Sequence, residues 1–318
     1  MVLQVLRRAD VKFEYPAYSV GNEKLPKNTY IVSIPPAQKI IFNPDICGNE
    51  LRRYSLECSR LFLRAAWAVA PRLRKISLDR ICELVMLRGS LGYCLDQAFQ
   101  LETGQYLPRC FIGVKRRRIS GGEFEADVFY VSFDALPDNG FLFAGETIAT
   151  GATLSQALAT TRSELRERDY DVKGLIFFTI AGSAVGAEKL REWESRFREW
   201  WPNFRVYLIA SEALFGLGEN GTDLLFRREG AIVPEETKER VSRIYGDYEK
   251  GYLPGKICAI FDWGDRNFRP TRHLEDLANF CREHLRVAKE GKAREVLRSL
   301  LQRAMRKKKE FTSRIVLR

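Results

Sequence analysis

The spacing of hydrophobic residues changes several times along the chain, and each change predicts a new element. Short continuous apolar runs are typical of buried strands, and five occur at residues 82–87, 110–114, 140–144, 174–180 and 205–209. Apolar residues recurring every three or four positions predict amphipathic helices at residues 49–70, 91–100, 153–169 and 187–200. Because strands that alternate with helices form parallel βαβ units, we predict an α/β fold with a doubly wound, mostly parallel sheet.

The two ends of the chain lack this alternation. Residues 30–34 and 39–42 are predicted to be extended, on either side of the turn-prone pair Pro35 and Pro36. Near the C-terminus, two apolar stripes at helical spacing are backed by arginine-rich faces, which predicts two basic helices. The predicted parts are a small N-terminal extended region at 1–48, an α/β domain at 49–272 with an insertion at about 227–257, and a basic helical C-terminal extension at 273–318.

Charge separates the C-terminal extension from the rest of the chain. The 318 residues have a formal net charge of +11, and residues 282–318 hold 13 Lys or Arg against four Asp or Glu, a surplus of +9. The preceding residues therefore carry about +2, by subtraction of +9 from +11. No apolar stretch approaches the roughly 20 residues that a membrane helix needs, so we expect a cytoplasmic protein without membrane association.

Cysteine and histidine usage narrows the possible chemistry. The seven cysteines form no CxxC pair, which favours reduced, mostly buried thiols. The chain has two histidines, His273 and His284, and we expect both at the surface. This composition excludes a multi-histidine metal centre and disfavours Ser–His–Asp or Cys–His catalysis, so no protein metal site is predicted.

The segment at 141–154, FLFAGETIATGATL, carries the strongest chemical signal. An apolar strand runs into a loop of small residues, and the loop opens a helix. Such a loop lets backbone N–H groups approach a phosphate, with help from the helix dipole and from the hydroxyls of Thr150 and Thr153. The carboxylate of Glu146 can accept hydrogen bonds from ribose hydroxyls. An ordinary strand–turn–helix, whose glycine only closes the turn, is the alternative.

Four further segments accompany this loop in a set order: 86–92 (MLRGSLG), 111–116 (FIGVKR), 210–221 with its AS and GLGENG pieces, and 262–266 (DWGDR). Together with the loop, they resemble the type I phosphoribosyltransferases, and most closely the uracil phosphoribosyltransferases. The loop is similar to that family's diphosphate-sugar motif. Order and spacing agree from about residue 49 to residue 221, roughly half of the chain.

The resemblance implies a reaction and a set of site residues. The reaction is transfer of a phosphoribosyl group from phosphoribosyl pyrophosphate to a nucleobase, uracil or a related pyrimidine, with substrate-bound Mg²⁺ and release of pyrophosphate. The product would be a nucleoside monophosphate. The implied catalytic residues are Arg88, Glu146 and Asp262. The implied phosphate- and ribose-binding residues are Gly89, Gly92, Arg116, Thr150, Gly151, Ala152, Thr153, Asp265 and Arg266.

The sequence departs from the family at two places. Gly145 stands where the family loop normally opens with aspartate, so Glu146 is the one carboxylate left in the loop. Between Gly221 and Asp262 the family has only a few residues around the base, and this chain carries an insertion of about 30 residues there. The first departure puts catalysis in doubt, and the second puts uracil in doubt.

The basic C-terminal extension supports a second hypothesis. A non-catalytic protein of this fold could keep a nucleotide-sized pocket and bind RNA or the ribosome through its basic C-terminal helices, because clustered cations release counterions from nucleic acid. A solvated appendage, an oligomer contact such as that of a homodimer, and a membrane-surface role of these helices are further alternatives. Phosphoribosyl transfer stays the favoured hypothesis. The cations that would contact nucleic acid are Arg303, Arg306, Lys307, Lys308 and Lys309.

Overall fold

The computed structural model describes residues 5–118 and 124–315. Within these residues the main sheet has nine strands: β1 (Val5–Arg8), β2 (Ala17–Gly21), β3 (Asn28–Val32), β4 (Ile81–Leu87), β5 (Arg109–Arg118), β6 (Phe124–Ser132), β7 (Gly140–Gly145), β8 (Val172–Thr179) and β10 (Arg205–Ser211). Their order is β1-β2-β3-β10-β8-β7-β4-β5-β6. The six strands from β3 to β5 in that order pair parallel, while β1, β2 and β6 join by antiparallel pairing. The prediction of an α/β fold with a mostly parallel sheet is confirmed.

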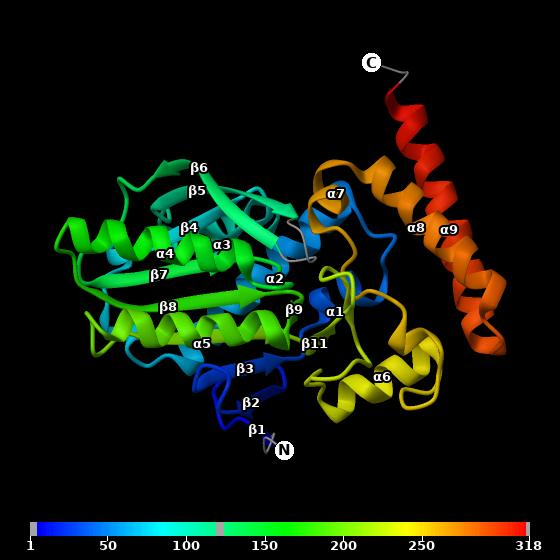
Figure 1. The fold of residues 1–318 in the computed structure, drawn as a ribbon, viewed down its shortest axis with the longest axis horizontal. Coiled ribbons are helices and arrows are strands. Elements are labelled where there is room, and N and C mark those ends of the chain that lie inside the picture. Colours follow the sequence, from blue (N-terminus) through cyan, green and yellow to red (C-terminus); the bar gives the residue numbers. More distant parts are fainter. Residues whose placement is uncertain (1–4, 119–123, 316–318) are drawn as a thin grey trace.

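The strand order contains a point at which the chain reverses direction across the sheet. Strand β5 lies on one side of β4, and the later strands β7, β8 and β10 follow one another on the other side (Figure 1). The loops that leave β4 and β7 therefore diverge from each other at the carboxyl ends of these two neighbouring strands. In doubly wound sheets this crevice is where ligands bind.

Helices cover both faces of the sheet (Figure 1). Side chains alternate along each strand: Phe141 and Phe143 of β7 face one core, and Leu142 and Ala144 face the other. Helices α2 and α3 pack on the first face, and α4 and α5 on the second. The helices are α1 (Pro35–Phe42), α2 (Gly48–Val69), α3 (Leu95–Thr103), α4 (Ala152–Glu167), α5 (Ala184–Arg198), α6 (Glu235–Tyr245), α7 (Trp263–Phe268), α8 (Pro270–Val287) and α9 (Gly291–Ile315).

Shorter elements complete the fold. Single 3₁₀ turns are η1 (Leu73–Lys75), η2 (Leu78–Arg80), η3 (Gly89–Tyr93) and η4 (Leu253–Gly255). A small second sheet, in the order β12-β11-β9, is formed by β9 (Gly182–Ser183), β11 (Leu214–Leu217) and β12 (Leu224–Leu225). The turn η3 and the small sheet both lie beyond the carboxyl ends of the main strands, so they border the crevice.

One predicted strand near the N-terminus is wrong. Residues 39–42 belong to helix α1, and Pro35 and Pro36 occupy its first turn rather than a separate turn. Proline is compatible with the first turn of a helix because the N–H it lacks has no partner there. The N-terminal strands are also part of the main sheet, since β3 pairs parallel with β10.

The strand predicted at 110–114 extends further into the basic residues that follow it. Lys115 and Arg116 continue β5 and pair with Asp127 and Ala126 of β6. Residues 119–123 lie outside the described residues. Arg116 is thus placed on a β-hairpin, which the sequence pattern had not indicated.

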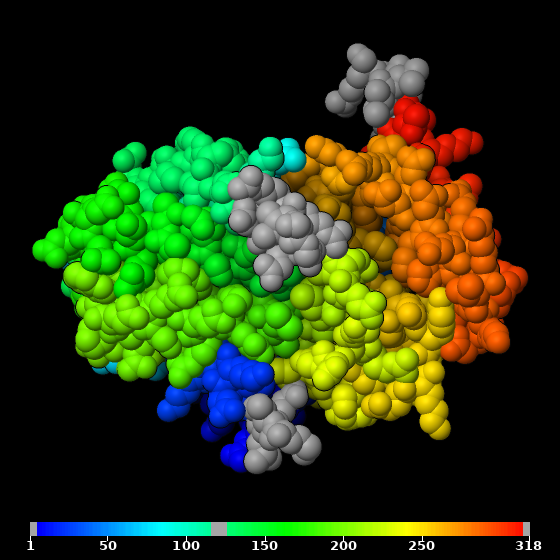
Figure 2. All heavy atoms as spheres, in the orientation of Figure 1, coloured from blue at the N-terminus to red at the C-terminus, as the bar shows by residue number. Residues whose placement is uncertain are grey.

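The C-terminal helices α8 and α9 share a core with the body of the protein. Buried side chains of both helices belong to the same cluster as those of α1 and α2: Leu274, Leu277, Cys281, Leu297, Leu300 and Ala304. Figure 2 shows these helices, in orange and red, at one end of the molecule. No helix of the described residues is long and apolar enough to cross a membrane.

Ion pairs fasten α9 to the start of α2. Asp45 is nearly buried and lies 3.0 Å from the Arg303 Nε and 3.1 Å from the Lys307 Nζ, while Lys307 also reaches Glu50 at 2.9 Å. Burial by itself raises the pKa of the Asp45 carboxyl, but the two cations outweigh it and hold that pKa below its usual value. The charged face of α9 is therefore partly used inside the molecule.

The surface position predicted for His273 is wrong. Its ring is buried, with Nε2 2.7 Å from the carbonyl oxygen of Pro44. Burial lowers the pKa of His273 to about 4, so the ring is neutral at physiological pH. This histidine packs α8 against the chain that follows α1.

Candidate functional site

A cavity of about 500 Å³ opens at the crevice where the chain reverses direction. Five segments line it: the end of β4, Val114 of β5, the loop between β7 and α4, the turn before β12, and the chain entering α7. Its polar and glycine residues are Arg88, Gly89, Glu146, Thr147, Gly151, Thr153, Thr222, Asp223, Asp262 and Gly264. The structure thus brings together Arg88, Gly89, Glu146, Gly151, Ala152, Thr153 and Asp262 of the residues predicted from sequence.

Glu146 is held at the mouth of the loop that follows β7. Its Oε1 accepts a hydrogen bond of 2.8 Å from the Thr147 N–H, and its Oε2 accepts one of 3.3 Å from the Ser90 hydroxyl. The carboxylate lies directly over Gly89, so close that a Cβ at that position would collide with it. A side chain at position 89 would displace the Glu146 carboxylate, so Gly89 leaves the space in which this carboxylate lies.

Helix α4 presents its N-terminus to the cavity. Gly151 is its N-cap, with a φ of 80° that favours glycine, and Ala152, Thr153 and Leu154 of the first turn line the cavity wall. The first N–H groups of a helix have no partner within the helix, so they are available to an anion. Thr150 lies one residue outside this wall, and its hydroxyl accepts a hydrogen bond of 3.4 Å from the Ala152 N–H.

Arg88 leaves β4 toward solvent at the cavity edge. It is exposed, and its guanidinium lies 5.8 Å from the centre of the Phe268 ring. The peptide bond joining it to Leu87 is cis. The following turn, η3, is attached to α7, because the Trp263 indole Nε1 donates a 2.9 Å hydrogen bond to the Gly89 carbonyl oxygen. The backbone of η3 is thus fixed to α7, while the Arg88 side chain is exposed at the edge of the cavity.

Tyr93 occupies the space beside Gly145. A Cβ at Gly145 would stand 2.8 Å from the Cδ1 and 2.9 Å from the Cγ of the Tyr93 ring. That ring is fully buried, and its hydroxyl accepts a 3.0 Å hydrogen bond from the Ile180 N–H. Burial raises the pKa of Tyr93 well above its usual value, so the hydroxyl stays neutral. The acid that the family has at position 145 has no room here.

The segment 262–266 contributes less to the cavity than predicted. Asp262 lines it and caps α7, accepting a 2.7 Å hydrogen bond from the Asp265 N–H. Asp265 instead pairs with Arg272 at 3.1 Å and with Arg269 at 3.7 Å, on the other side of the helix. Neither Asp265 nor Gly92 is among the residues that line the cavity.

The predicted role of Arg266 in phosphate binding is wrong. The side chain is fully buried, and its guanidinium donates to the carbonyl oxygens of Ile40 (2.6 Å), Ile46 (2.7 Å), Asn43 (2.9 Å) and Ile260 (3.2 Å). These bonds end α1 and join it to α7. Because the side chain is fully buried, does not line the cavity and uses four of its five N–H donors on these carbonyls, Arg266 is not placed to bind a phosphate there.

The charges around the cavity suit a polyanion that arrives with a divalent cation. One cation, Arg88, and three carboxylates, those of Glu146, Asp223 and Asp262, line the same cavity. Among the described residues no group of three or more His, Cys, Asp or Glu is arranged to hold a metal ion. Carboxylate and phosphate oxygens are the ligands that Mg²⁺ prefers, so the residues fit a Mg²⁺ ion shared with a bound phosphate.

Sequence reasoning assigned no role to Thr222, Asp223, Phe261 or Trp263, which also line the cavity. The two segments they come from are joined by a bridge between Leu225 and Cys258. No short motif signals this bridge. The one available signal was the position of Asp223 and Thr222 directly after the GLGENG piece of the resemblance.

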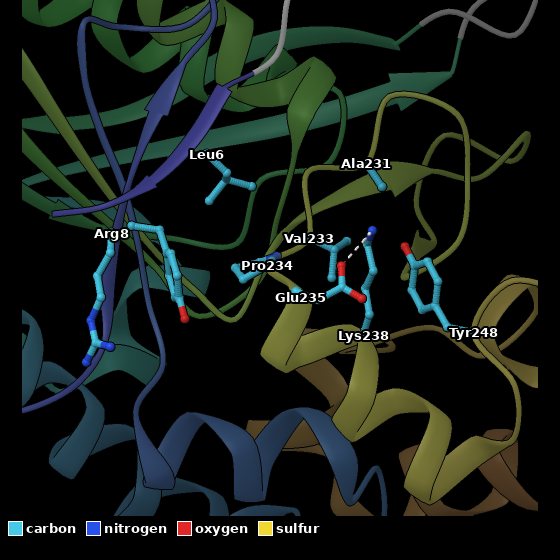
Figure 3. Close-up of a pocket in the computed structure, with 9 residues that line it drawn as sticks. Leu6, Arg8, Ala231, Val233, Pro234, Glu235, Lys238 and Tyr248 are labelled. Atoms are coloured by element: carbon cyan, nitrogen blue, oxygen red, sulfur yellow. Dashed lines mark ion pairs between the residues drawn. The ribbon is translucent and has the colours of Figure 1, made fainter.

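A second cavity, of about 560 Å³, lies between the β1–β2 hairpin and α6 (Figure 3). Its side chains come from both elements, with Leu6 and Arg8 on one side and Lys238 and Tyr248 on the other. Lys238 is paired with Glu235 at 3.3 Å. None of the residues predicted for the site lines it.

Comparison with known proteins leaves the family open. No protein-family model and no curated protein matches the chain. Among solved structures, the hypoxanthine-guanine phosphoribosyltransferase of L. donovani is 14% identical, with 52% of this chain and 83% of that chain covered and a TM-score of 0.31. The hypoxanthine phosphoribosyltransferase of Trypanosoma cruzi, with the product IMP, is 16% identical over 61% and 92% of the two chains, with a TM-score of 0.27.

A hypothetical protein from Neisseria gonorrhoeae with bound ppGpp is 9% identical over 42% of this chain and 67% of that chain, with a TM-score of 0.26. Similarity at this level assigns no family and no substrate. The residues of the cavity must therefore carry the functional argument.

Proposed function

We propose that this protein binds phosphoribosyl pyrophosphate in the 500 Å³ cavity and transfers its phosphoribosyl group to a nucleobase. The observation that carries the proposal is the convergence of Arg88, Glu146 and the α4 N-terminus at one crevice of a doubly wound sheet. Arg88 supplies a positive charge, Glu146 can accept hydrogen bonds from ribose hydroxyls, and the N-terminus of α4 can bind a phosphate. The three groups come from different elements of the fold.

Each group has a distinct task in the proposed reaction. The Thr153 N–H and the Thr153 hydroxyl, in the first turn of α4, bind the 5′-phosphate. Glu146 accepts hydrogen bonds from the ribose hydroxyls and favours the positive charge that develops on the ribose ring. Arg88 stabilises the negative charge that develops on the leaving pyrophosphate. When bound, Mg²⁺ would neutralise part of the pyrophosphate charge.

We do not restrict the acceptor of the proposed reaction to one base. Uracil is what the sequence resemblance implies, but the wall formed by Thr222, Asp223 and Phe261 comes from chain that the resemblance does not cover well. We therefore propose a nucleobase as acceptor and leave its identity to a test with a panel of bases.

The test is base-dependent release of pyrophosphate. Protein, phosphoribosyl pyrophosphate and Mg²⁺ are incubated with uracil, cytosine, adenine, guanine or hypoxanthine, and pyrophosphate is measured. One base should support turnover, and Arg88→Ala should abolish it. If nucleoside monophosphates bind in the cavity but no base supports turnover, the enzyme proposal is wrong.

A non-catalytic nucleotide-binding role is the second candidate, and one observation favours it. Tyr93 fills the place of the missing acid beside Gly145, so the cavity has lost a ribose contact that the family has. In this case nucleoside monophosphates would bind with the affinity that the phosphate loop provides, and pyrophosphate release would stay at background for every base.

As part of this second candidate, we propose that the C-terminal helices also bind RNA. Arg303 and Lys307 are committed to Asp45, and Lys308 lies 3.1 Å from Glu275. Arg306, whose side chain is 69% exposed and lies 3.9 Å from the exposed Glu310, and the exposed Lys309 remain on the surface. RNA affinity should fall by about 0.7 log units per log unit of salt for each phosphate contacted on a single strand.

The experiment for RNA binding must keep α9, because its Leu297, Leu300 and Ala304 are buried in the core. A double substitution Arg306→Gln and Lys309→Gln removes exposed charge without disturbing that core. RNA binding at low salt should weaken in this variant. A full chain that binds no RNA at low salt would rule the addition out.

A further inference from the structure

We infer that Asp223 selects the acceptor base of the proposed reaction, by accepting hydrogen bonds from two adjacent N–H donors on the base. Of the common nucleobases, this edge favours guanine. The inference rests on the proposed function, because it assigns the base end of the same cavity.

Asp223 is held in place by its own turn. The Asn220 side-chain oxygen accepts hydrogen bonds of 3.0 Å from the N–H groups of Thr222 and Asp223, and the Gly218 N–H donates to the Asp223 carbonyl at 2.7 Å. The backbone around Asp223 is thus closed on itself before the chain enters β12. Its carboxylate starts from a defined position on the cavity wall.

The next residue ties this turn to the opposite segment. The Leu224 N–H donates to the Cys258 sulfur at 3.3 Å, and the Ala259 N–H donates to the Leu224 carbonyl at 2.7 Å. These bonds place Asp223 beside Ile260 and Phe261, which line the same cavity. Apolar surface and one carboxylate are therefore adjacent in a single wall.

The rest of the cavity is already assigned to phosphate and ribose. The α4 N-terminus takes one phosphate, Arg88 and Gly89 face the leaving group, and Glu146 lies between them. The wall that holds Asp223 is the part without a phosphate-binding group. A flat base with polar edges fits a wall of apolar side chains and one fixed acceptor.

Asp223 also differs from the other two carboxylates of the cavity. Glu146 accepts from Ser90 and Thr147, and Asp262 accepts from the Asp265 N–H. Across residues 5–118 and 124–315, no hydrogen bond or ion pair engages the Asp223 carboxylate. Its two oxygens are available to a ligand.

The chemistry of a carboxylate decides between the bases. An ionised carboxylate only accepts hydrogen bonds, and two parallel bonds to it are favourable. Guanine offers such a pair, its ring N1–H and its 2-amino group. Uracil offers one N–H flanked by two carbonyl oxygens, which a carboxylate repels. Hypoxanthine is guanine without the 2-amino group, so comparing the two bases measures the hydrogen bond that this amino group makes.

The test compares GMP with IMP on two proteins. By calorimetry with and without Mg²⁺, the wild-type chain should bind GMP at least ~10-fold more tightly than IMP, the effect of one charge-assisted hydrogen bond. Asp223→Asn should remove this preference by weakening GMP, with a change in IMP of less than about 3-fold. Glu219→Gln is the matched control, since Glu219 lies in the same turn, has an 86% exposed side chain and pairs with Arg228 outside the cavity.

The outcomes separate this inference from the proposed function. Equal binding of GMP and IMP by the wild-type chain overturns the inference, while the proposed function survives if Thr153→Ala still weakens both. If Asp223→Asn weakens both nucleotides equally and only with Mg²⁺, Asp223 is a metal contact and the base assignment is wrong. If neither nucleotide binds, the inference falls, and the panel of bases decides the proposed function. Should Asp223→Asn fail to fold, the wild-type preference for GMP over IMP decides alone.

Discussion

Arg88 and Arg266 come from two segments of the same resemblance, yet the structure uses them in opposite ways. Arg88 is exposed at the cavity edge, with an aromatic ring as its neighbour. Arg266 is fully buried and donates to four backbone carbonyls. Burial lowers the pKa of Arg266 to about 10, so it still carries its charge near neutral pH. An arginine is available to a ligand only if its neighbours have left its donors unused.

The largest expected effect concerns stability at Arg266. Arg266→Met leaves four buried carbonyls without their donor and should lower the free energy of unfolding by about 4 kcal/mol. Arg88→Met makes the same chemical change at an exposed side chain and should stay within about 0.5 kcal/mol of the wild type. Denaturant unfolding followed by circular dichroism measures both. Equal stability of the two variants would break the contrast.

The reverse contrast is expected in binding. Arg88→Ala should weaken phosphoribosyl pyrophosphate binding by about 30-fold, or ~2 kcal/mol, because it removes charge-assisted hydrogen bonds to the pyrophosphate. Titration calorimetry with Mg²⁺ measures this change. Arg88→Lys, which keeps the charge but not the planar fork, should lose part of the affinity. Unchanged binding in Arg88→Ala would remove this arginine from the site.

A smaller effect should distinguish the two threonines of the phosphate loop. Thr153→Ala removes a hydroxyl at the cavity wall and should weaken binding of a nucleoside monophosphate by ~10-fold, or ~1.4 kcal/mol. Thr150 lies outside the wall, so Thr150→Ala should cost less. Thr153→Ser is the control that keeps the hydroxyl. If the double variant Thr150→Ala/Thr153→Ala binds the nucleotide as well as the wild type does, the loop does not hold the phosphate.

The smallest effect extends the contrast to the C-terminal helices. Asp45→Asn breaks the pairs with Arg303 and Lys307 and should cost about 1 kcal/mol of stability at pH 7. Because the folded-state pKa of Asp45 is lowered, its contribution is fully present above the usual carboxyl pKa and is lost as pH falls through the lower, folded value. The difference from the wild type should therefore shrink below about pH 4. A difference that is constant with pH would mean that the pairs add nothing.

The sheet could largely be predicted because its parallel strands are continuous apolar runs. Strands β4, β7, β8 and β10 each fall within a residue or two of the predicted boundaries. Helix α1 could not be predicted, because Pro35 and Pro36 suggest a turn as strongly as they suit a first helical turn. The strand character of Lys115 and Arg116 depends on pairing with β6, which their charged sequence does not show.

The candidate site was predictable where the backbone conformation requires particular residues in a particular order. The phosphate loop between β7 and α4 needs small residues in a fixed order, and that order is visible in the sequence. Burial is not visible in this way, so Arg266 and His273 were misplaced. Asp223 was missed because its position depends on contacts between β12 and residues 258–259, which are distant in the chain.

The close contact between Tyr93 and Gly145 makes an acid at position 145 hard to introduce. Gly145→Asp alone forces an acid against a buried ring, and Tyr93→Ala alone leaves an empty space that costs about 3 kcal/mol or more. The two positions are therefore epistatic: each substitution is harmful unless the other is already present. A lineage with this pair has to cross a fitness valley to acquire an acid at position 145. Engineering an acid into this loop should start from the double change and not from position 145 alone.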